Sequence, residues 1–263
     1  MEIKNNVVWI TGASSGIGEA LSYRLNQAGA KLIISSRNTE ALYLVKSKCS
    51  INPLDIHVLP LDLEDTLTLK EKAESALKIY GRIDLIIHSG GISQRALAID
   101  TPIEVAQKIM NINFWGTVAL TQAILPYMSS QQSGQIVVIS SLVGKFGTKY
   151  RSAYSASKHA LHGYFDSLRS EIAANVKICI ICPGFIKTNV TINALKADGS
   201  KQNSMDDAQA NGMSSDECAR QIIKAITSGK EEAYIGGKET YAVLFKRMFP
   251  GLFSKIVRRA KVT

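Results

Sequence analysis

The sequence predicts an α/β fold in which a doubly wound parallel sheet of about seven strands is flanked by helices on both faces. Short runs of β-branched residues alternate along the chain with longer segments of helical period. A glycine-rich turn joins the first run to the first helical segment. No linker-like stretch divides the 263 residues, so we expect a single domain over residues 1–263.

The expected strands and helices alternate along the chain. The strands are expected at residues 7–11, 31–36, 56–61, 83–89, 135–141, 176–182 and 233–235. The helices are expected at residues 16–28, 39–48, 66–80, 102–127, 152–174 and 215–227. Because parallel strands are joined by right-handed crossovers, these helices should cover both faces of the sheet.

One segment, residues 187–213, interrupts this alternation. It is rich in Asn, Asp, Ser, Gly and Gln, and it follows a predicted strand end, where ligands usually bind in such folds. It is long for a simple connection, so we predict a lid over a substrate site. A surface excursion without a role is the alternative.

The formal net charge of +9 is concentrated at the C-terminal end. Residues 238–263 contain seven Lys and Arg residues but one acidic residue. The charge therefore describes this tail more than the whole surface, and we expect no nucleic-acid partner.

In the tail, residues 239–263, apolar and basic side chains alternate around Pro250 and Gly251, as in two short amphipathic helices. Such helices can cover a substrate pocket or form a subunit interface, which we favour. They can also make peripheral contact with an anionic membrane surface.

The apolar runs are short: those at 7–10 and 136–139 fall well below the roughly 20 residues that span a bilayer. The N-terminal residues also lack the apolar segment and cleavage site of a secretory signal. We therefore expect a cytoplasmic protein.

The four cysteines are Cys49, Cys179, Cys182 and Cys218. Cys179 and Cys182 have the C-x-x-C spacing of metal and redox sites, but they lie inside a predicted buried strand. No second pair is present to complete a zinc shell. We expect buried thiols and no metal.

The glycine-rich turn, Gly12-Ala13-Ser14-Ser15-Gly16-Ile17-Gly18, lies between a predicted strand and a predicted helix. Glycines allow a tight turn and a close approach of the backbone to a pyrophosphate, which the positive end of the helix attracts. This placement predicts the dinucleotide-binding loop of a Rossmann-type fold, formed by Gly12, Ser14, Ser15, Gly16, Ile17 and Gly18. An ordinary tight turn is the alternative.

Arg37 follows the second predicted strand, about 19 residues after Gly18. An acidic residue at this place would bind the ribose 2′-hydroxyl of NAD, and none is present. A guanidinium suits a 2′-phosphate instead. We therefore expect NADP(H) rather than NAD(H), with a solvated surface arginine as the alternative.

Tyr154 and Lys158 stand four residues apart in a predicted helix. This spacing places both side chains on one face. An ammonium group beside the phenol would stabilise the phenolate and lower the pKa of Tyr154, so that the phenol could exchange protons nearer neutral pH. Together with the phosphate loop, the pair predicts nicotinamide-dependent carbonyl chemistry.

Five motifs occur in an order and spacing that resemble the short-chain dehydrogenase/reductase family, over nearly the whole chain. They are Thr11 to Gly18, Asn113-Phe114-Trp115-Gly116, Ser140-Ser141, Tyr154 with Lys158, and Pro183-Gly184. Residues 136–145 look particularly like the branch that contains the hydroxysteroid dehydrogenases.

The resemblance implies roles for four residues. Tyr154 would be the general acid in carbonyl reduction and the base in alcohol oxidation. Lys158 would hold the nicotinamide ribose, and Ser141 would bind the reacting oxygen. Asn113 would position a water for proton relay to the lysine.

The resemblance also implies further cofactor contacts. Asp62 would lie against the adenine, and Ile186 and Thr188 would meet the nicotinamide amide and a nearby phosphate. The other implied contacts are Leu63, Ser89, Gly90, Tyr154, Lys158, Pro183 and Gly184.

One motif departs from the family pattern. The chain reads His88-Ser89-Gly90-Gly91 where the family commonly reads Asn-Asn-Ala-Gly. Small residues can preserve backbone contacts to a cofactor. We expect His88 to be a packed residue at a strand end rather than a catalyst.

The expected function is NADPH-dependent reduction of a ketone or aldehyde, with alcohol oxidation as the reverse. Phe146, Tyr150 and Phe185 near the motifs permit an apolar pocket for a steroid-like, retinoid-like or lipid-derived substrate. A 3-oxoacyl thioester reductase and a sugar alcohol dehydrogenase remain open. A non-catalytic NADPH sensor or scaffold is the alternative from another class. The resemblance implies a homodimer or homotetramer that associates through the helices containing Asn113 and Tyr154.

Overall fold

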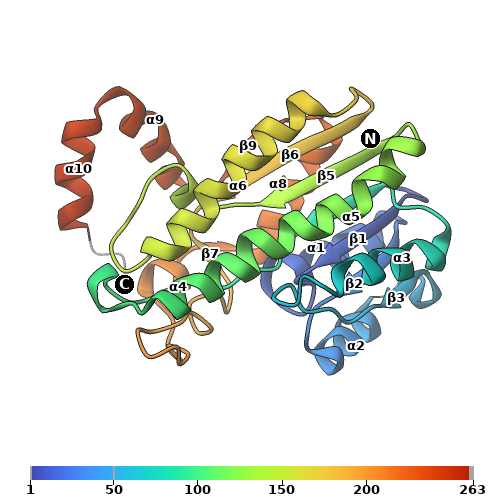
Figure 1. Cartoon of the computed structure of the whole chain (residues 1–263), viewed down its shortest axis with the longest axis horizontal. Helices are drawn as coiled ribbons and strands as arrows, with labels where there is room; N and C mark the ends of the chain where they lie inside the picture. The colour runs from blue at the N-terminus through green and yellow to red at the C-terminus, as the bar shows by residue number, and fades with distance from the viewer. Residues whose placement is uncertain (1, 50, 261–263) are drawn as a thin grey trace.

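A computed structural model of the chain describes residues 2–49 and 51–260. Its main sheet has seven parallel strands in the order β3-β2-β1-β4-β5-β6-β9 (Figure 1). The strands are β1 (Val7–Thr11), β2 (Lys31–Ser35), β3 (Ile56–Val58), β4 (Leu85–His88), β5 (Gly134–Ile139), β6 (Val176–Pro183) and β9 (Glu232–Ile235). From β1 the chain adds β2 and β3 toward one edge of the sheet, and it then returns to add β4, β5, β6 and β9 toward the other edge. A crevice forms between β1 and β4, beyond the carboxyl ends of the strands, where the two series begin.

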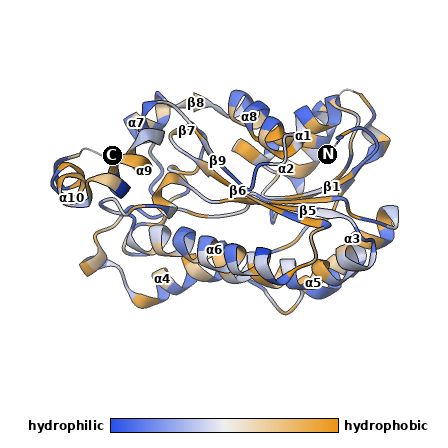
Figure 2. Cartoon of the chain, turned by 90° about the horizontal axis from the view of Figure 1, so that it is seen from above, coloured by the Kyte–Doolittle hydropathy of each residue, from blue (hydrophilic) through white to orange (hydrophobic). Residues whose placement is uncertain are grey.

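The helices lie on both faces of the sheet (Figure 2). The first face carries α1 (Gly16–Gln27), α2 (Thr39–Lys48) and α8 (Ser215–Thr227). The second carries α3 (Leu69–Tyr80), α4 (Ile103–Met110), α5 (Gly116–Ser130) and α6 (Ser152–Glu171). Short 3₁₀ turns occur at Pro53–Asp55, Ala98–Asp100, Leu142–Gly144 and Lys238–Thr240. The predicted doubly wound sheet is confirmed.

Several boundaries differ from the sequence prediction by a few residues, and two of the differences are informative. The expected helix 102–127 is two helices, because the π-helical turn Asn111–Trp115 separates α4 from α5. β3 ends at Val58, although the amide of Leu59 still donates to the carbonyl of Ile34. Pro60 does not interrupt the bonding to β2, because the amide of Leu61 donates to the carbonyl of Ser36 at 3.2 Å. In this edge strand, an amide at residue 60 would face away from β2, so a proline is tolerated there.

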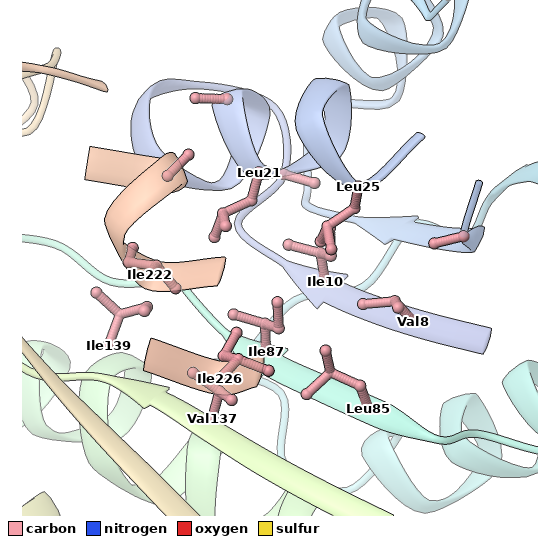
Figure 3. Close-up of a cluster of buried hydrophobic side chains, with 14 of the residues drawn as sticks. Val8, Ile10, Leu21, Leu25, Leu85, Ile87, Val137, Ile139, Ile222 and Ile226 are labelled. Carbon is pink, nitrogen blue, oxygen red and sulfur yellow. The ribbon is translucent and has the colours of Figure 1, made fainter. Parts of the chain in front are cut away.

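The first hydrophobic core fills the space between the sheet and helices α1 and α8 (Figure 3). Side chains from the strands meet side chains from both helices in this layer. They include Val8, Ile10, Leu85, Ile87, Val137 and Ile139 from the sheet and Leu21, Leu25, Ile222 and Ile226 from the helices. Because these side chains exclude water from the sheet, the strand ends that form the crevice are held rigidly.

The second core lies on the opposite face of the sheet, and the two cysteines of the C-x-x-C motif belong to different cores. Cys179 belongs to the first core and Cys182 to the second. Both thiols are free and buried. The burial agrees with the expectation from the sequence, and the two thiols face opposite sides of β6 rather than each other.

Residues 187–213 contain little regular structure. The short strands β7 (Ile186–Lys187) and β8 (Met213–Ser214) pair in parallel at the two ends of this segment. Between them lies the short helix α7 (Asp207–Ala210). The amide of Leu195 donates to the carbonyl of Ser93, and the carbonyl of Leu195 accepts from the amide of Arg95. The segment is therefore held against the chain that follows β4.

The tail forms the two expected helices, α9 (Tyr241–Met248) and α10 (Pro250–Arg259), at one end of the molecule (Figure 1). Phe253 of α10 packs edge-on against Phe146, with 5.1 Å between ring centroids. The last part of the predicted tail, residues 261–263, lies outside the described residues. Within the described ranges, none of the helices combines the length and apolar character needed to cross a bilayer.

Candidate active site

A cavity of about 660 Å³ lies at the carboxyl ends of the central strands. Most residues predicted to bind the cofactor line it. These are Gly12, Ser14, Ser15, Gly16, Ile17, Arg37, Asp62, Leu63, Ser89, Gly90, Tyr154, Lys158, Pro183, Gly184, Ile186 and Thr188. Ser141 lines it as well. Gly18 and Asn113 are not among the residues that line the cavity.

The glycine-rich loop is shaped by two close backbone approaches. Gly12 has φ of +68°, and a Cβ added there would lie 2.6 Å from the backbone of Gly90. A Cβ at Gly18 would lie 2.3 Å from the carbonyl oxygen of Gly12. Gly18 thus allows α1 to pack against the turn, whereas Ser14 to Ile17 place the N-terminus of α1 at the cavity. This cradle fits a pyrophosphate.

Arg37 lies at the end of the cavity beyond β2, beside Ser36 and Asn38. The side chain is exposed and has no hydrogen-bonding or ionic partner among the described residues. Asp62, at the same end, accepts a hydrogen bond from the amide of Glu64. Residues 36–38 contain no carboxylate. A ligand bound at this end of the cavity therefore meets the unpaired guanidinium of Arg37 rather than an acidic side chain.

Tyr154 and Lys158 both face the cavity from α6. The Lys158 ammonium lies 5.8 Å from the centre of the Tyr154 ring. It donates a hydrogen bond to the carbonyl oxygen of Ile139 at 2.8 Å. The four-residue spacing brings the two side chains together as expected, but the ammonium is held by the end of β5.

The expected lowering of the Tyr154 pKa is not produced by the protein groups alone. Burial raises the pKa of Tyr154, and this effect outweighs the lowering caused by the Ser141 hydroxyl and the guanidiniums of Arg151 and Arg95. Burial also lowers the pKa of Lys158 to about 8.

Asn113 lies in the π-helical turn and is fully buried. Its side-chain oxygen accepts from the amide of Ile92 at 2.8 Å, and its amide group donates to the carbonyl of Ile92 at 2.9 Å. It also donates to the Ser157 hydroxyl at 3.0 Å. Asn113 therefore joins the chain after β4 to the helix that carries Tyr154 and Lys158.

Gln94 organises the same helix from a distance, and no motif indicated it. Its side-chain oxygen accepts from the amides of Ala153 at 2.8 Å and Tyr154 at 3.4 Å. Its amide group donates to the hydroxyls of Thr101 at 2.8 Å and Ser152 at 3.3 Å. The buried Gln94 thus caps the N-terminus of α6 in place of a local capping side chain.

Glu239 is a second residue that the sequence did not indicate. Its carboxylate accepts from the amides of Phe185 at 3.2 Å and Gly237 at 3.0 Å. A Cβ at Gly184 would lie 2.3 Å from this carboxylate. The start of the tail therefore holds the Pro183-Gly184 turn at the wall of the cavity.

His88 is packed at the end of β4, as expected. It is buried, and its Nε2 lies 3.0 Å from the Thr121 hydroxyl. Burial lowers its pKa to about 3, so the ring is neutral at physiological pH. Two residues later, Gly90 leaves room for the side chain of Leu63, since a Cβ at Gly90 would lie 2.5 Å from it.

One group of metal-ligating side chains, His162, Cys182 and Glu232, comes together near β6 and β9. The imidazole separates the other two, because Nε2 lies 3.6 Å from Cys182 and Nδ1 lies 3.5 Å from Glu232. Lys145 also pairs with the Glu232 carboxylate at 2.6 Å. His162 Nε2 also lies 3.0 Å from the Ser140 hydroxyl, whereas its Nδ1 has no hydrogen-bond partner among the described residues.

The model of the short chain dehydrogenase family matches residues 6–199. The chain is also 40% identical to a dehydrogenase/reductase SDR family protein 7-like of Anopheles gambiae, covering 98% of this chain and 83% of that protein. It is 40% identical to dehydrogenase/reductase SDR family member 7B of Mus musculus, covering 97% and 81%. The chain belongs to the short-chain dehydrogenase/reductase family.

Two solved structures show the same fold. A short-chain dehydrogenase/reductase from Burkholderia phymatum in complex with NAD has a TM-score of 0.85 at 18% identity, with 96% of each chain covered. A short-chain dehydrogenase from Burkholderia cenocepacia in complex with NADP has a TM-score of 0.82 at 20% identity, covering 99% of this chain and all of that one. With the family shown above, the chain is an NAD(P)-dependent oxidoreductase that acts on CH-OH donors or the corresponding carbonyls.

Proposed function

We propose that the chain is an NADPH-dependent reductase of a hydrophobic ketone or aldehyde. The observation that carries the choice of cofactor is Arg37, which lines the adenosine end of the cavity without a partner among the described residues. A guanidinium binds a 2′-phosphate through several charge-assisted hydrogen bonds. A ribose hydroxyl, which prefers a carboxylate acceptor, finds none at residues 36–38.

The chain's own residues can perform the proton chemistry of this reaction. The Tyr154 hydroxyl donates a proton to the reacting oxygen, and the neighbouring Ser141 hydroxyl holds that oxygen by a hydrogen bond. Lys158 and Asn113 keep the helix and the cavity wall in register through Ile139 and Ile92. The bound cofactor supplies the hydride.

The substrate end of the cavity supports an apolar substrate, although by other residues than expected. Ile92, Val190 and Leu195 line it. Phe146 is instead buried against the tail. Tyr150 and Phe185 are not among the lining residues either, and the polar side chains of Asn189, Asn193, Lys201 and Gln209 line the same side. The proposal of a hydrophobic carbonyl compound that also carries polar groups rests on this mixed lining.

Binding of NADPH and NADH to an Arg37→Ala variant tests the cofactor proposal. Loss of a charge-assisted contact to the 2′-phosphate should weaken NADPH binding by roughly 10- to 100-fold and leave NADH binding within about twofold. The exposed Lys48→Ala, on the same side of the fold, is the matched control. An equal loss for both cofactors would contradict the preference for NADPH.

We also propose a homodimer or homotetramer that associates through α5 and α6. The exposed face of α6 carries the small residues Ala156, Gly163 and Ser167, which allow another helix to approach closely. A Cβ at Gly163 would meet nothing within 4 Å, so Gly163→Arg should fold normally. Light scattering should show smaller particles for this variant, whereas an unchanged mass would contradict the interface.

For the tail we propose peripheral contact with an anionic membrane surface. None of the described residues of α9 or α10 is among those that line the cavity, which favours membrane contact over a cover for the substrate site. Six large apolar side chains remain exposed on these helices and at the junction between them: Tyr241, Leu244, Met248, Phe249, Leu252 and Ile256. Basic residues stand between them, which favours acidic lipid headgroups.

Flotation with vesicles of phosphatidylcholine and phosphatidylserine tests this contact. Leu244→Gln with Leu252→Gln should reduce the bound fraction severalfold without unfolding the exposed helices. Leu54→Gln with Leu67→Gln, which are even more exposed and lie outside the tail, is the control. Equal flotation of both double variants would contradict the proposal.

A further inference from the structure

Three charged side chains form a buried ion group between the lid segment and the helix that carries Tyr154. Asp206 Oδ2 accepts from Arg95 at 2.8 Å (Nε) and 2.5 Å (Nη2), and from Arg151 Nη2 at 3.3 Å. The side chains of Arg95, Asp206 and Arg151 are 5%, 2% and 7% exposed. Charged side chains are rarely buried this deeply unless they are paired.

The three residues come from three separate parts of the chain. Asp206 lies in residues 187–213, the orange loops around β7 in Figure 1. Arg95 lies in the chain after β4, and Arg151 immediately precedes α6. The ion group therefore ties the lid segment to both elements that hold Tyr154 in place.

Further hydrogen bonds fix each partner. Arg151 Nη1 donates to the Thr148 hydroxyl at 3.3 Å. Asp206 Oδ1 accepts from Gln202 at 2.9 Å. Arg95 Nη1 donates to the Ser93 hydroxyl at 2.9 Å and to the carbonyl of Gln94 at 2.6 Å. The carboxylate is thus bonded through both oxygens, as a buried charge requires.

The segment that this ion group holds forms part of the cavity wall. Asn193, Leu195, Lys201 and Gln209 line the cavity, and they surround Asp206 in sequence. Movement of the segment away from Arg95 and Arg151 would open this wall. The group therefore connects this wall of the cavity to Arg95 and Arg151.

We propose that Asp206 is a latch that holds residues 187–213 closed over the cavity, and that Arg95 and Arg151 are positioning residues that couple this closure to Tyr154. The proposal rests on the proposed function for its assumption that the closed cavity holds the substrate.

The coupling to Tyr154 has an electrostatic part. The groups that act on the phenol are the Ser141 hydroxyl and the two guanidiniums, which all lower its pKa, with the Lys158 ammonium 5.8 Å from the ring centre. Loss of either guanidinium removes a cation that favours the phenolate. The latch partners therefore influence both the position of the lid and the proton affinity of Tyr154.

Hydrogen exchange of Asp206→Asn, measured with and without NADPH, tests the latch. Asparagine keeps the shape but removes the charge that pairs two arginines, so exchange over residues 195–206 should rise at least about tenfold. Asp198→Asn is the matched control, because Asp198 lies in the same segment but bonds only within it, to Ser200. Unchanged exchange in Asp206→Asn would overturn the proposal.

Arg95→Lys provides a second variant if Asp206→Asn does not fold. Lysine keeps the positive charge but lacks the planar fork of donors, so exchange over the same residues should rise about threefold or more. Exchange equal to that of the parent protein would count against the latch.

Titration of Tyr154 tests the coupling separately. In protein labelled with ¹³C at tyrosine Cζ, the Tyr154 signal is assigned by its loss in Tyr154→Phe. The midpoint should move to higher pH in Arg95→Met and in Arg151→Met, and a merely structural role would leave it in place. Neither this titration nor the exchange measurement needs turnover, so both remain interpretable if NADPH-dependent reduction is not observed.

Discussion

The Lys158 ammonium is held 2.8 Å from the carbonyl oxygen of Ile139, the last residue of β5. A neighbouring strand end, rather than the phenol of Tyr154, therefore fixes the lysine at the cavity. Because the donor is buried and its pKa is lowered to about 8, the charged form depends on the partners that the cavity provides. The central sheet thereby sets the distance between the two functional groups on α6.

Gln94→Leu should destabilise the N-terminus of α6. The substitution keeps the side-chain volume but leaves the amide of Ala153 without its 2.8 Å acceptor, so the free energy of unfolding should fall by about 1–3 kcal/mol. Urea denaturation measures this change. Gln107→Leu, on the exposed side of α4, is the control, and equal stabilities of the two variants would show that Gln94 is not a cap.

Gly12→Ala should damage both the fold and cofactor binding. Alanine at φ of +68° with its Cβ 2.6 Å from the backbone of Gly90 must displace one of the two chains. We expect a loss of about 1–3 kcal/mol in stability and at least a tenfold weaker binding of NADPH. Fluorescence titration with NADPH measures the second effect.

Gly147→Ala is the control for this experiment. Its Cβ would meet nothing within 4 Å, and its φ lies outside the positive range. The control should bind NADPH as the parent protein does. Parent-like binding by Gly12→Ala as well would refute the role of the close approach.

His88 should make the protein less stable in mild acid. Its folded pKa is about 3 and its ordinary value is 6.5, so between these pH values the unfolded chain binds the extra proton. Stability therefore falls as pH decreases through this range, with a slope of up to about 1.4 kcal/mol per pH unit from this residue.

His88→Asn should flatten that part of the stability curve. Urea denaturation between pH 4 and pH 7 measures the slope, and His57→Asn, on the exposed side of β3, controls for the loss of a histidine. If both variants keep the parent slope, the buried neutral imidazole is not its source.

The features that could be predicted from the sequence depend on local patterns. The β-branched runs and helical periods located all seven main strands and most helices, and the glycine loop was found because its residues are consecutive. The motif did not distinguish Gly18, which packs α1 against Gly12, from the glycines at the cavity. The π-helical turn at Asn113 was missed because the helical period continues through it.

The remaining site residues could not be found from local patterns because their contacts are long-range. Gln94 caps a helix 59 residues later, and Arg95 pairs with Asp206 across 111 residues. Glu239 reaches Phe185 across 54 residues. These polar residues resemble ordinary surface residues until the fold brings them together.

The most direct test of the account compares turnover and cofactor binding in Tyr154→Phe. This variant keeps the ring and removes the hydroxyl that donates the proton. NADPH-dependent reduction of a panel of hydrophobic ketones and aldehydes should fall by about 10²- to 10⁴-fold, while NADPH binding stays within about twofold of the parent value. Parent-like reduction by the phenylalanine variant would contradict the central claim.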